Sequence, residues 1–177
     1  TEERVMQIYY VNKNATKVVS DSYKPKNSGG EELLKELLEV LQTNPDNLEY
    51  RQVIPSEVRV VNSYIENKQV YLVFDSAYSL LSRITEILSR AAIVRTLTQI
   101  EGVETVVLYI NDQPLMDALN QPVGQMKASD FIDDLGGDIN DYQKTVLTLY
   151  YTNEQGNTVF WGETLMITRK RCLPYII

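Results

Sequence analysis

The sequence predicts an α+β fold in which one sheet carries two helices on a single face. Three observations lead to this class. β-prone apolar runs occur in pairs separated by short polar turns, and two longer segments repeat apolar residues at helical spacing. The segments follow one another as strand, strand, helix, strand, strand, helix, strand. With 177 residues, 44% of them hydrophobic, the chain can bury a substantial core.

The first half of this pattern is a hairpin followed by a leucine-rich helix. Residues 4–12 and about 16–24 are predicted strands joined by a polar turn. Ser28 and Glu31 have the spacing of a capping box, so the helix should begin there, and it should end at residues 44–46, Asn-Pro-Asp. Leucines spaced by three and four predict one buried stripe: Leu33, Leu34, Leu37, Leu38 and Leu41. The charged residues between them are expected to face water: Glu32, Lys35, Glu36 and Glu39.

The second half repeats the same order with a longer helix. Residues 58–66 and 69–75 are predicted strands around a tight turn, and residues 103–110 form a nearly continuous apolar strand of a sheet interior. A helix is predicted from about residue 79 to residue 100. Its buried side should carry Leu80, Leu81, Ile84, Ile87, Leu88, Ala91, Val94 and Leu97.

An internal repeat predicts how the chain is divided. Residues 4–19 return 141 positions later as residues 145–160, and both copies run from an apolar-Tyr-Tyr strand through a polar turn into a second β-prone run. We therefore expect a first domain over residues 1–115, a connector over 116–144, and an incomplete second domain over 145–177.

The composition excludes several classes of function. The chain has no histidine and one cysteine, Cys172, which excludes Ser-His-Asp and Cys-His catalysis, histidine or multi-cysteine metal sites, and an intrachain disulfide. The net charge of −7 opposes binding to nucleic acid or to an anionic membrane surface. A carboxylate pair of the glycosidase type could arise by chance among 24 acidic residues, but no motif marks one. The sequence predicts a protein that is not an enzyme and has no cofactor and no metal site.

Two acidic features allow more than one interpretation. Asp75 ends a strand just before a helix, where it either caps the turn by accepting backbone N–H bonds or lies at the mouth of a cleft, and we favour the cap. The acidic residues within 133–141 either bind calcium or form a solvated loop. We favour the loop, because the spacing of an EF-hand is missing.

Tyrosine is the other unusual feature, because 12 of the aromatic residues are tyrosines and only four are Phe or Trp. A tyrosine ring with its polar tip suits both cross-strand packing on a solvated sheet and a contact surface for sugars or proteins. The pairs Tyr9-Tyr10 and Tyr150-Tyr151 place one ring on each side of a sheet. The candidate binding residues are Tyr10, Tyr64, Tyr71 and Tyr109.

The residues also resemble a known family, that of the GerM domain, or sporulation and spore germination domain. The resemblance rests on the apolar-Tyr-Tyr opening strand, the leucine-rich first helix, and Tyr71-Leu-Val-Phe-Asp75-Ser-Ala-Tyr78 before the second helix. Its most specific part is Leu97-Thr-Gln-Ile-Glu-Gly-Val-Glu-Thr-Val-Val-Leu-Tyr-Ile-Asn-Asp112. It covers about residues 4–115, and 145 to about 164 again.

The resemblance implies an extracytoplasmic protein of spore-forming or related Gram-positive bacteria, with a fold similar to the ring-building motifs of secretion systems. Family members act by assembly or envelope binding, and no catalytic residues carry over. We expect partners among envelope proteins or other copies of the chain, with peptidoglycan as the alternative, and membrane contact only through a lipid anchor outside this sequence. An assembly module should show a flat or edge-to-edge protein contact, whereas a glycan binder should show a groove with co-planar exposed aromatic rings.

Overall fold

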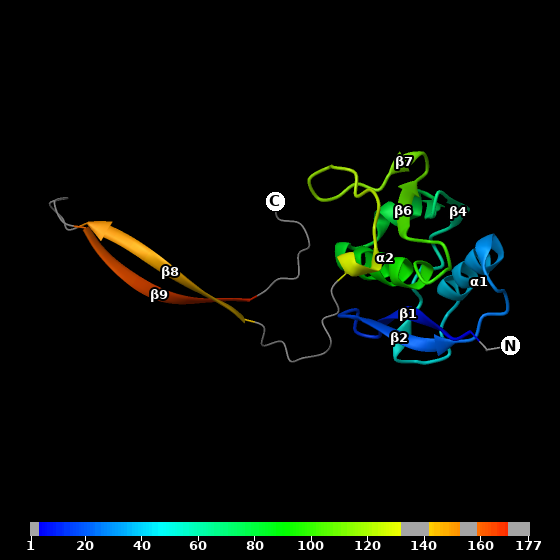
Figure 1. Ribbon diagram of the computed structural model, residues 1–177, viewed down its shortest axis with the longest axis horizontal. Coiled ribbons are helices and arrows are strands. Elements are labelled where there is room, and N and C mark those ends of the chain that lie inside the picture. The colour runs from blue at the N-terminus through cyan, green and yellow to red at the C-terminus, as the bar shows by residue number, and fades with distance from the viewer. Residues whose placement is uncertain (1–3, 132–141, 153–158, 170–177) are drawn as a thin grey trace. The chain divides into compact units, whose positions relative to one another are not determined.

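The computed structural model describes residues 4–131, 142–152 and 159–169 (Figure 1). The chain divides into two compact units, Thr1–Asp133 and Asp134–Ile177, which are described separately. The first unit contains, in order, β1 (Met6–Asn12), β2 (Val18–Tyr23), α1 (Gly30–Gln42), β3 (Tyr50–Arg51), β4 (Val60–Glu66), β5 (Gln69–Phe74), the 3₁₀ helix η1 (Ser76–Leu80), α2 (Arg83–Leu97), β6 (Thr105–Ile110), β7 (Gln113–Pro114) and the 3₁₀ helix η2 (Ala128–Asp130). The predicted α+β class and the order of the main elements are confirmed.

The strands of this unit lie in two sheets, so the predicted single sheet is wrong. One sheet has the order β2-β1-β3 and the other has the order β4-β5-β6-β7. Figure 1 shows α2 running between β1 on one side and β6 on the other. The helices therefore form a layer between two sheets instead of covering one sheet from a single side.

Side chains within α2 and just after it bond to the backbone of β1. The backbone N–H of Gln7 donates to Gln99 Oε1 at 2.9 Å, and Gln99 Nε2 donates back to the carbonyl oxygen of Gln7 at 2.7 Å. The N–H of Tyr9 donates to Thr96 Oγ1 at 3.1 Å. On this side β1 pairs with β3 only at Val11 and Asn12, so side chains instead of a strand satisfy the backbone at Gln7 and Tyr9.

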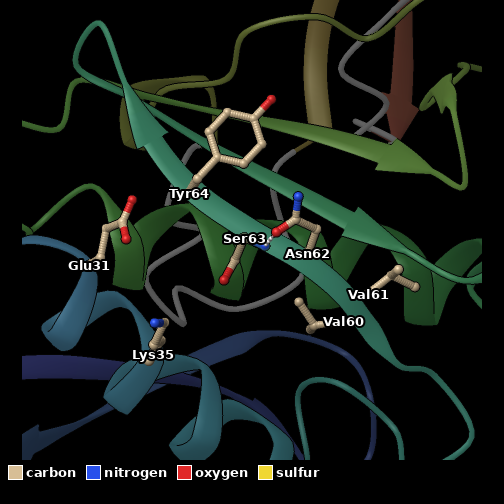
Figure 2. A pocket seen from close by; sticks show the side chains of 7 residues that line it. All are labelled: Glu31, Lys35, Val60, Val61, Asn62, Ser63 and Tyr64. Carbon is tan, nitrogen blue, oxygen red and sulfur yellow. Dashed lines mark hydrogen bonds between the residues drawn. The ribbon is translucent and has the colours of Figure 1, made fainter.

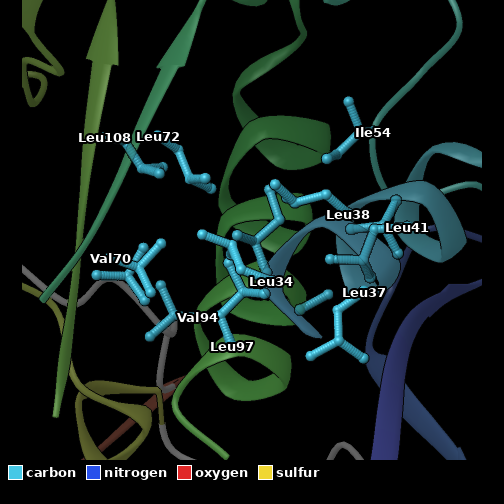
Figure 3. Packing of buried hydrophobic residues seen from close by; sticks show 14 of the residues in the cluster. Leu34, Leu37, Leu38, Leu41, Ile54, Val70, Leu72, Val94, Leu97 and Leu108 are labelled. Carbon is cyan, nitrogen blue, oxygen red and sulfur yellow. The ribbon is translucent and has the colours of Figure 1, made fainter. Parts of the chain in front are cut away.

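The leucine stripe of α1 is buried as predicted. All five leucines are at most 4% exposed, because they meet apolar side chains of α2 and of the four-stranded sheet. Figure 3 shows this core with Leu34, Leu37, Leu38 and Leu41 of α1, Val94 and Leu97 of α2, and Val70, Leu72 and Leu108 of the sheet. The predicted capping box does not form, since the helix begins after Gly29 without a side-chain cap. The carbonyl oxygen of Ser28 instead accepts a bond from the Arg4 guanidinium at 3.0 Å.

Glu36 is half-buried, although its helical position predicts a residue that faces water. Its carboxylate accepts bonds from the Tyr23 hydroxyl at 2.7 Å, from the N–H of Lys26 at 2.8 Å, and from the N–H and side-chain amide of Asn27 at 2.9 and 2.8 Å. Burial alone would raise the pKa of this carboxyl, but the four hydrogen bonds outweigh it and hold the pKa below its ordinary value. Burial and the bond to Glu36 raise the pKa of Tyr23 to about 12.

This cluster predicts a dependence of stability on acid pH. Because the pKa of Glu36 is lower in the folded state, its contribution is present above the pKa of the unfolded chain and is lost as pH falls through the folded value. Glu36→Gln is expected to lower the free energy of unfolding by about 1 kcal/mol at neutral pH and to flatten the loss of stability on acidification. Urea titrations at several pH values test this, with Glu39→Gln on the exposed side of α1 as the control. Equal slopes for the wild type and Glu36→Gln would contradict it.

The second helix differs from its prediction at its N-terminal end. The segment divides into η1 and α2, and the side chain of Ser82 caps α2 by accepting the N–H of Thr85 at 3.2 Å. Leu80 is 86% exposed and Ile84 is 64% exposed, so their predicted burial is wrong. The break at Leu81 and Ser82 separates Leu80 from the helical phase on which its prediction depended, whereas Ile84 lies within the first turn of α2, on its exposed side.

Part of the predicted connector belongs to the first unit. The backbones of Val106 and Met126 exchange two hydrogen bonds of 2.9 Å, and Met126 and Leu115 are buried in the core. The Arg95 guanidinium also donates to the carbonyl oxygen of Phe131 at 2.6 Å. The first unit thus extends past residue 115, because residues 116–131 complete the outer side of β6. Residues 132–141, which include the whole acidic stretch, lie outside the described residues.

The second unit contains the predicted repeat of the hairpin. Its strands are β8 (Tyr142–Thr152) and β9 (Val159–Arg169), which pair antiparallel. Tyr10 pairs with Val19 in the first hairpin, and Tyr151 pairs with Phe160 in the second, so both partners are displaced by 141 positions. The repeat therefore preserves strand register as well as sequence. That residues 145–177 begin an incomplete second domain stays a prediction.

Candidate functional site

Three of the four candidate tyrosines meet on the outer face of the four-stranded sheet. Tyr64 comes from β4, Tyr71 from β5 and Tyr109 from β6, and all three are half-buried. The ring centroids of Tyr64 and Tyr71 lie 4.9 Å apart with 10° between the ring planes, and those of Tyr71 and Tyr109 lie 6.5 Å apart at 30°. We call these three residues and the surface that they form the tyrosine face.

Strand register explains this grouping. Asn67 and Lys68 have φ values of 49° and 64°, as in a two-residue hairpin turn, and this turn sets Tyr64 opposite Tyr71. The parallel pairing of β5 with β6 puts Tyr109 beside Val73, one diagonal step from Tyr71. Alternate residues of β5 point the other way into the core: Val70, Leu72 and Phe74.

The arrangement of the rings limits what the tyrosine face can bind. Because Tyr64 and Tyr71 stack on each other, one face of each ring is covered by its neighbour. The Tyr71 hydroxyl donates to Gln69 Oε1 at 2.8 Å, which fixes its orientation. A sugar stacks on an exposed ring face, whereas a protein surface can contact ring edges and hydroxyl groups. The stacking of Tyr64 on Tyr71 therefore reduces the ring area on which a sugar could stack.

Tyr10 does not belong to this surface. It lies on β1 in the three-stranded sheet, where its ring stacks on Tyr50 with centroids 5.3 Å apart. Burial raises its pKa, and the nearby carboxylates of Asp21 and Asp46 add to the effect. The sequence places Tyr10 correctly on a strand but carries no signal for which sheet that strand joins.

A groove of about 560 Å³ runs beside the tyrosine face, between α1 and β4. Figure 2 shows Glu31 and Lys35 of α1 on one side and residues of β4 on the other. It is lined by Glu31, Lys35, Val60, Val61, Asn62, Ser63 and Tyr64. Sequence reasoning missed this groove, since it depends on how α1 lies against a strand distant in the chain. A second groove of about 470 Å³ is lined by residues of the 44–57 loop.

The amino-acid sequence matches the model of one protein family. The model of the family Germane, described as sporulation and spore germination, matches residues 7–116. The chain belongs to the Germane family. No curated protein sequence matches the chain at a significant level. The matched region contains both helices of the first unit and all three residues of the tyrosine face.

Solved structures of this family share the fold. The tandem GerMN domains of the sporulation protein GerM from Bacillus subtilis match with a TM-score of 0.59 and 21% identity, over 94% of this chain and 61% of that chain. The first GerMN domain of the same protein matches with a TM-score of 0.54 and 25% identity, over 70% of this chain and 92% of that chain. This chain thus spans about three fifths of the tandem GerMN structure.

In this Germane domain, the polar residues that could suggest chemistry have structural roles. Asp75 Oδ1 accepts the N–H of Ala77 at 3.3 Å and that of Arg59 at 3.2 Å, so the predicted cap is confirmed. Glu86 accepts the hydroxyl of Tyr78 at 3.2 Å, and burial raises its pKa although Arg90 opposes this. Arg90 Nε lies 3.2 Å from Glu86 Oε1, so the two side chains form an ion pair. The contact does not have the geometry of a hydrogen bond.

Within the described residues, no group of three or more acidic or cysteine side chains is placed to hold a metal ion. None of the helices in the described ranges has the length and apolar character needed to cross a bilayer.

Proposed function

We propose that this chain is a non-catalytic module of the extracytoplasmic cell envelope that assembles with other proteins during sporulation or spore germination. Its place in the Germane family supports the link to sporulation and germination. The family resemblance supports an extracytoplasmic location at the membrane surface, with a lipid anchor outside this sequence.

The observation that carries the assembly role is the stacking on the tyrosine face. Tyr64 and Tyr71 stack on each other with Tyr109 beside them, so three half-buried rings lie together on one face of the sheet. Tyrosine is enriched at protein interfaces because a rigid ring buries apolar area while its hydroxyl keeps a hydrogen bond. The tyrosine face is thus the proposed contact surface, and Tyr71 is at its centre.

A cell-wall glycan is the second candidate ligand. Three tyrosines on one sheet face favour it, because aromatic rings are common contacts for sugars. The mutual stacking of Tyr64 and Tyr71 counts against it, since it covers one face of each ring and leaves less ring area for a sugar. We therefore rank protein assembly first.

Tyr71→Ala is expected to abolish capture of specific envelope proteins while leaving the domain folded, because it removes the central ring of the tyrosine face. Pull-down from envelope extract measures this, beside sedimentation with purified peptidoglycan. Tyr50→Ala is the matched control, since it removes a stacked tyrosine from the other sheet. Co-sedimentation with peptidoglycan that survives moderate salt and is lost only in Tyr71→Ala would reverse the ranking and make the tyrosine face a glycan site.

A further inference from the structure

The outer edge of β4 has backbone groups directed away from its own sheet. In a two-residue hairpin the closing pair is hydrogen-bonded and alternate pairs follow, so Glu66 and Tyr64 bond to β5. Ser63 and Ile65 then direct their backbone N–H and C=O groups outward. The N–H of Ser63 donates to Asn62 Oδ1 at 2.9 Å, as expected for an edge donor satisfied by a neighbouring side chain.

The groove beside this edge has the form of a site for an extended peptide. One wall is the edge of β4, where Val61 is 63% exposed, and the other is the solvent-exposed side of α1 with Glu31 and Lys35 (Figure 2). A space between an edge strand and a helix is a recurring place for strand addition, in which backbone bonds give affinity and side-chain contacts give specificity.

We propose that this groove binds an extended segment of a partner protein, which adds to β4 as a fifth strand and carries one basic and one acidic residue two positions apart. The inference rests on the proposed assembly function and names the surface and the kind of segment that it recognises. It differs from the tyrosine face in using backbone bonds of β4 and the charges of α1.

The charge spacing follows from the geometry of the two elements. Glu31 and Lys35 are one turn apart on α1, which corresponds to about 6 Å along a helix axis. Alternate residues of a strand point to the same side and are about 6.6 Å apart. A basic side chain of the peptide therefore meets Glu31 when an acidic side chain two residues away meets Lys35. The relative direction of the strands determines which charge comes first.

Asn62 controls access to the edge. Its side chain accepts the N–H of Ser63, so an added strand has to replace that bond with one of its own carbonyl groups. The irregular pairing between Val60 and Asn62 also bends β4 at this point. Removing the Asn62 side chain should therefore favour peptide binding, whereas removing the Ser63 N–H should weaken it.

Fluorescence anisotropy with short labelled peptides tests the proposal on the full chain. The probes are Val-Lys-Val-Glu-Val-Thr and Val-Glu-Val-Lys-Val-Thr, and the control peptide Val-Lys-Glu-Val-Val-Thr has the same composition with its charges on opposite sides. One probe should bind about tenfold more tightly than the control peptide. The double exchange Glu31→Lys with Lys35→Glu should switch the preference to the other probe.

Two variants of β4 complete the test. Ser63→Pro is expected to weaken binding by about tenfold while circular dichroism stays unchanged, because an edge strand tolerates proline where its N–H faces outward. Asn62→Ala should bind severalfold more tightly than the wild type. Equal affinities for all three peptides, or unchanged binding by a folded Ser63→Pro, would overturn the proposal. So would self-association that no peptide reverses, because a second copy would then occupy the groove.

The peptide-binding test of the groove can fail independently of the Tyr71 test of the assembly role. If these peptides fail while capture of envelope proteins still depends on Tyr71, the groove proposal is wrong and the assembly role stands. If peptide binding succeeds and no envelope protein depends on Tyr71, the contact surface is the β4 edge instead of the tyrosine face.

Discussion

Replacing Leu37 by alanine is expected to lower the free energy of unfolding of the first unit by about 2–5 kcal/mol. Leu37 is completely buried in the core between α1, α2 and the four-stranded sheet. The substitution loses the transfer free energy of the removed methyl groups and leaves a cavity that close-packed neighbours fill only in part. The change is a large fraction of the stability of an ordinary domain.

Leu80→Ala is the matched control for this prediction, because it removes the same atoms from a side chain that is 86% exposed. Its cost should stay within about 0.5 kcal/mol. Urea unfolding followed by helical circular dichroism measures both, since α1 and α2 lie in the first unit. Tryptophan fluorescence would report on the other unit, where the single tryptophan, Trp161, lies. Similar losses for the two variants would contradict the different burial of Leu37 and Leu80.

This pair of leucines also shows how far the sequence predicts the fold. The stripe of α1 is predictable because one uninterrupted helix keeps the phase of its leucines, and Leu37 is buried as its spacing indicates. Leu80 is also at helical spacing from the apolar residues of α2, so the same rule predicts its burial. The capping bond of Ser82 starts a new helix, however, and residues before the break no longer share the phase of those after it.

The alternation of apolar and polar residues does not predict which strands pair with each other. Alternation identifies the strands, but it does not show that the backbone of β1 bonds to the side chains of Thr96 and Gln99, more than 80 positions away in the sequence. The same limit applies to the candidate site. Alternation puts Tyr64 and Tyr71 on the open face of one hairpin, while the separation of Tyr10 from them depends on pairing that local sequence does not encode.

Glu36 gives a third example of this limit. Its position between the buried leucines predicts exposure to water, and the helix does turn it away from the core. The loop before α1 folds back over the carboxylate, because three residues of the chain bond to it. Periodicity describes the orientation of a side chain relative to its own helix, and it contains no information about which loop will cover that side chain.

Gln99→Ala is expected to lower the free energy of unfolding by about 2 kcal/mol, because the backbone N–H and C=O of Gln7 lose their partners at a partly buried position. The amide of Gln99 forms the same two bonds that a neighbouring strand would form with β1, at 2.9 and 2.7 Å. It also donates to the carbonyl oxygen of Arg95 at 2.9 Å, which holds the side chain in place. No apolar core is removed, so the loss should be smaller than for Leu37→Ala.

The same substitution should also increase self-association, because an unpaired strand edge is a template for pairing with another chain. Urea unfolding and sedimentation velocity measure the two effects, and Gln125→Ala on an exposed loop is the control with the same change in composition. If Gln99→Ala is as stable and as monodisperse as Gln125→Ala, the side chain does not protect β1. In that case the packing of α2 against β1 would be the next contact to test.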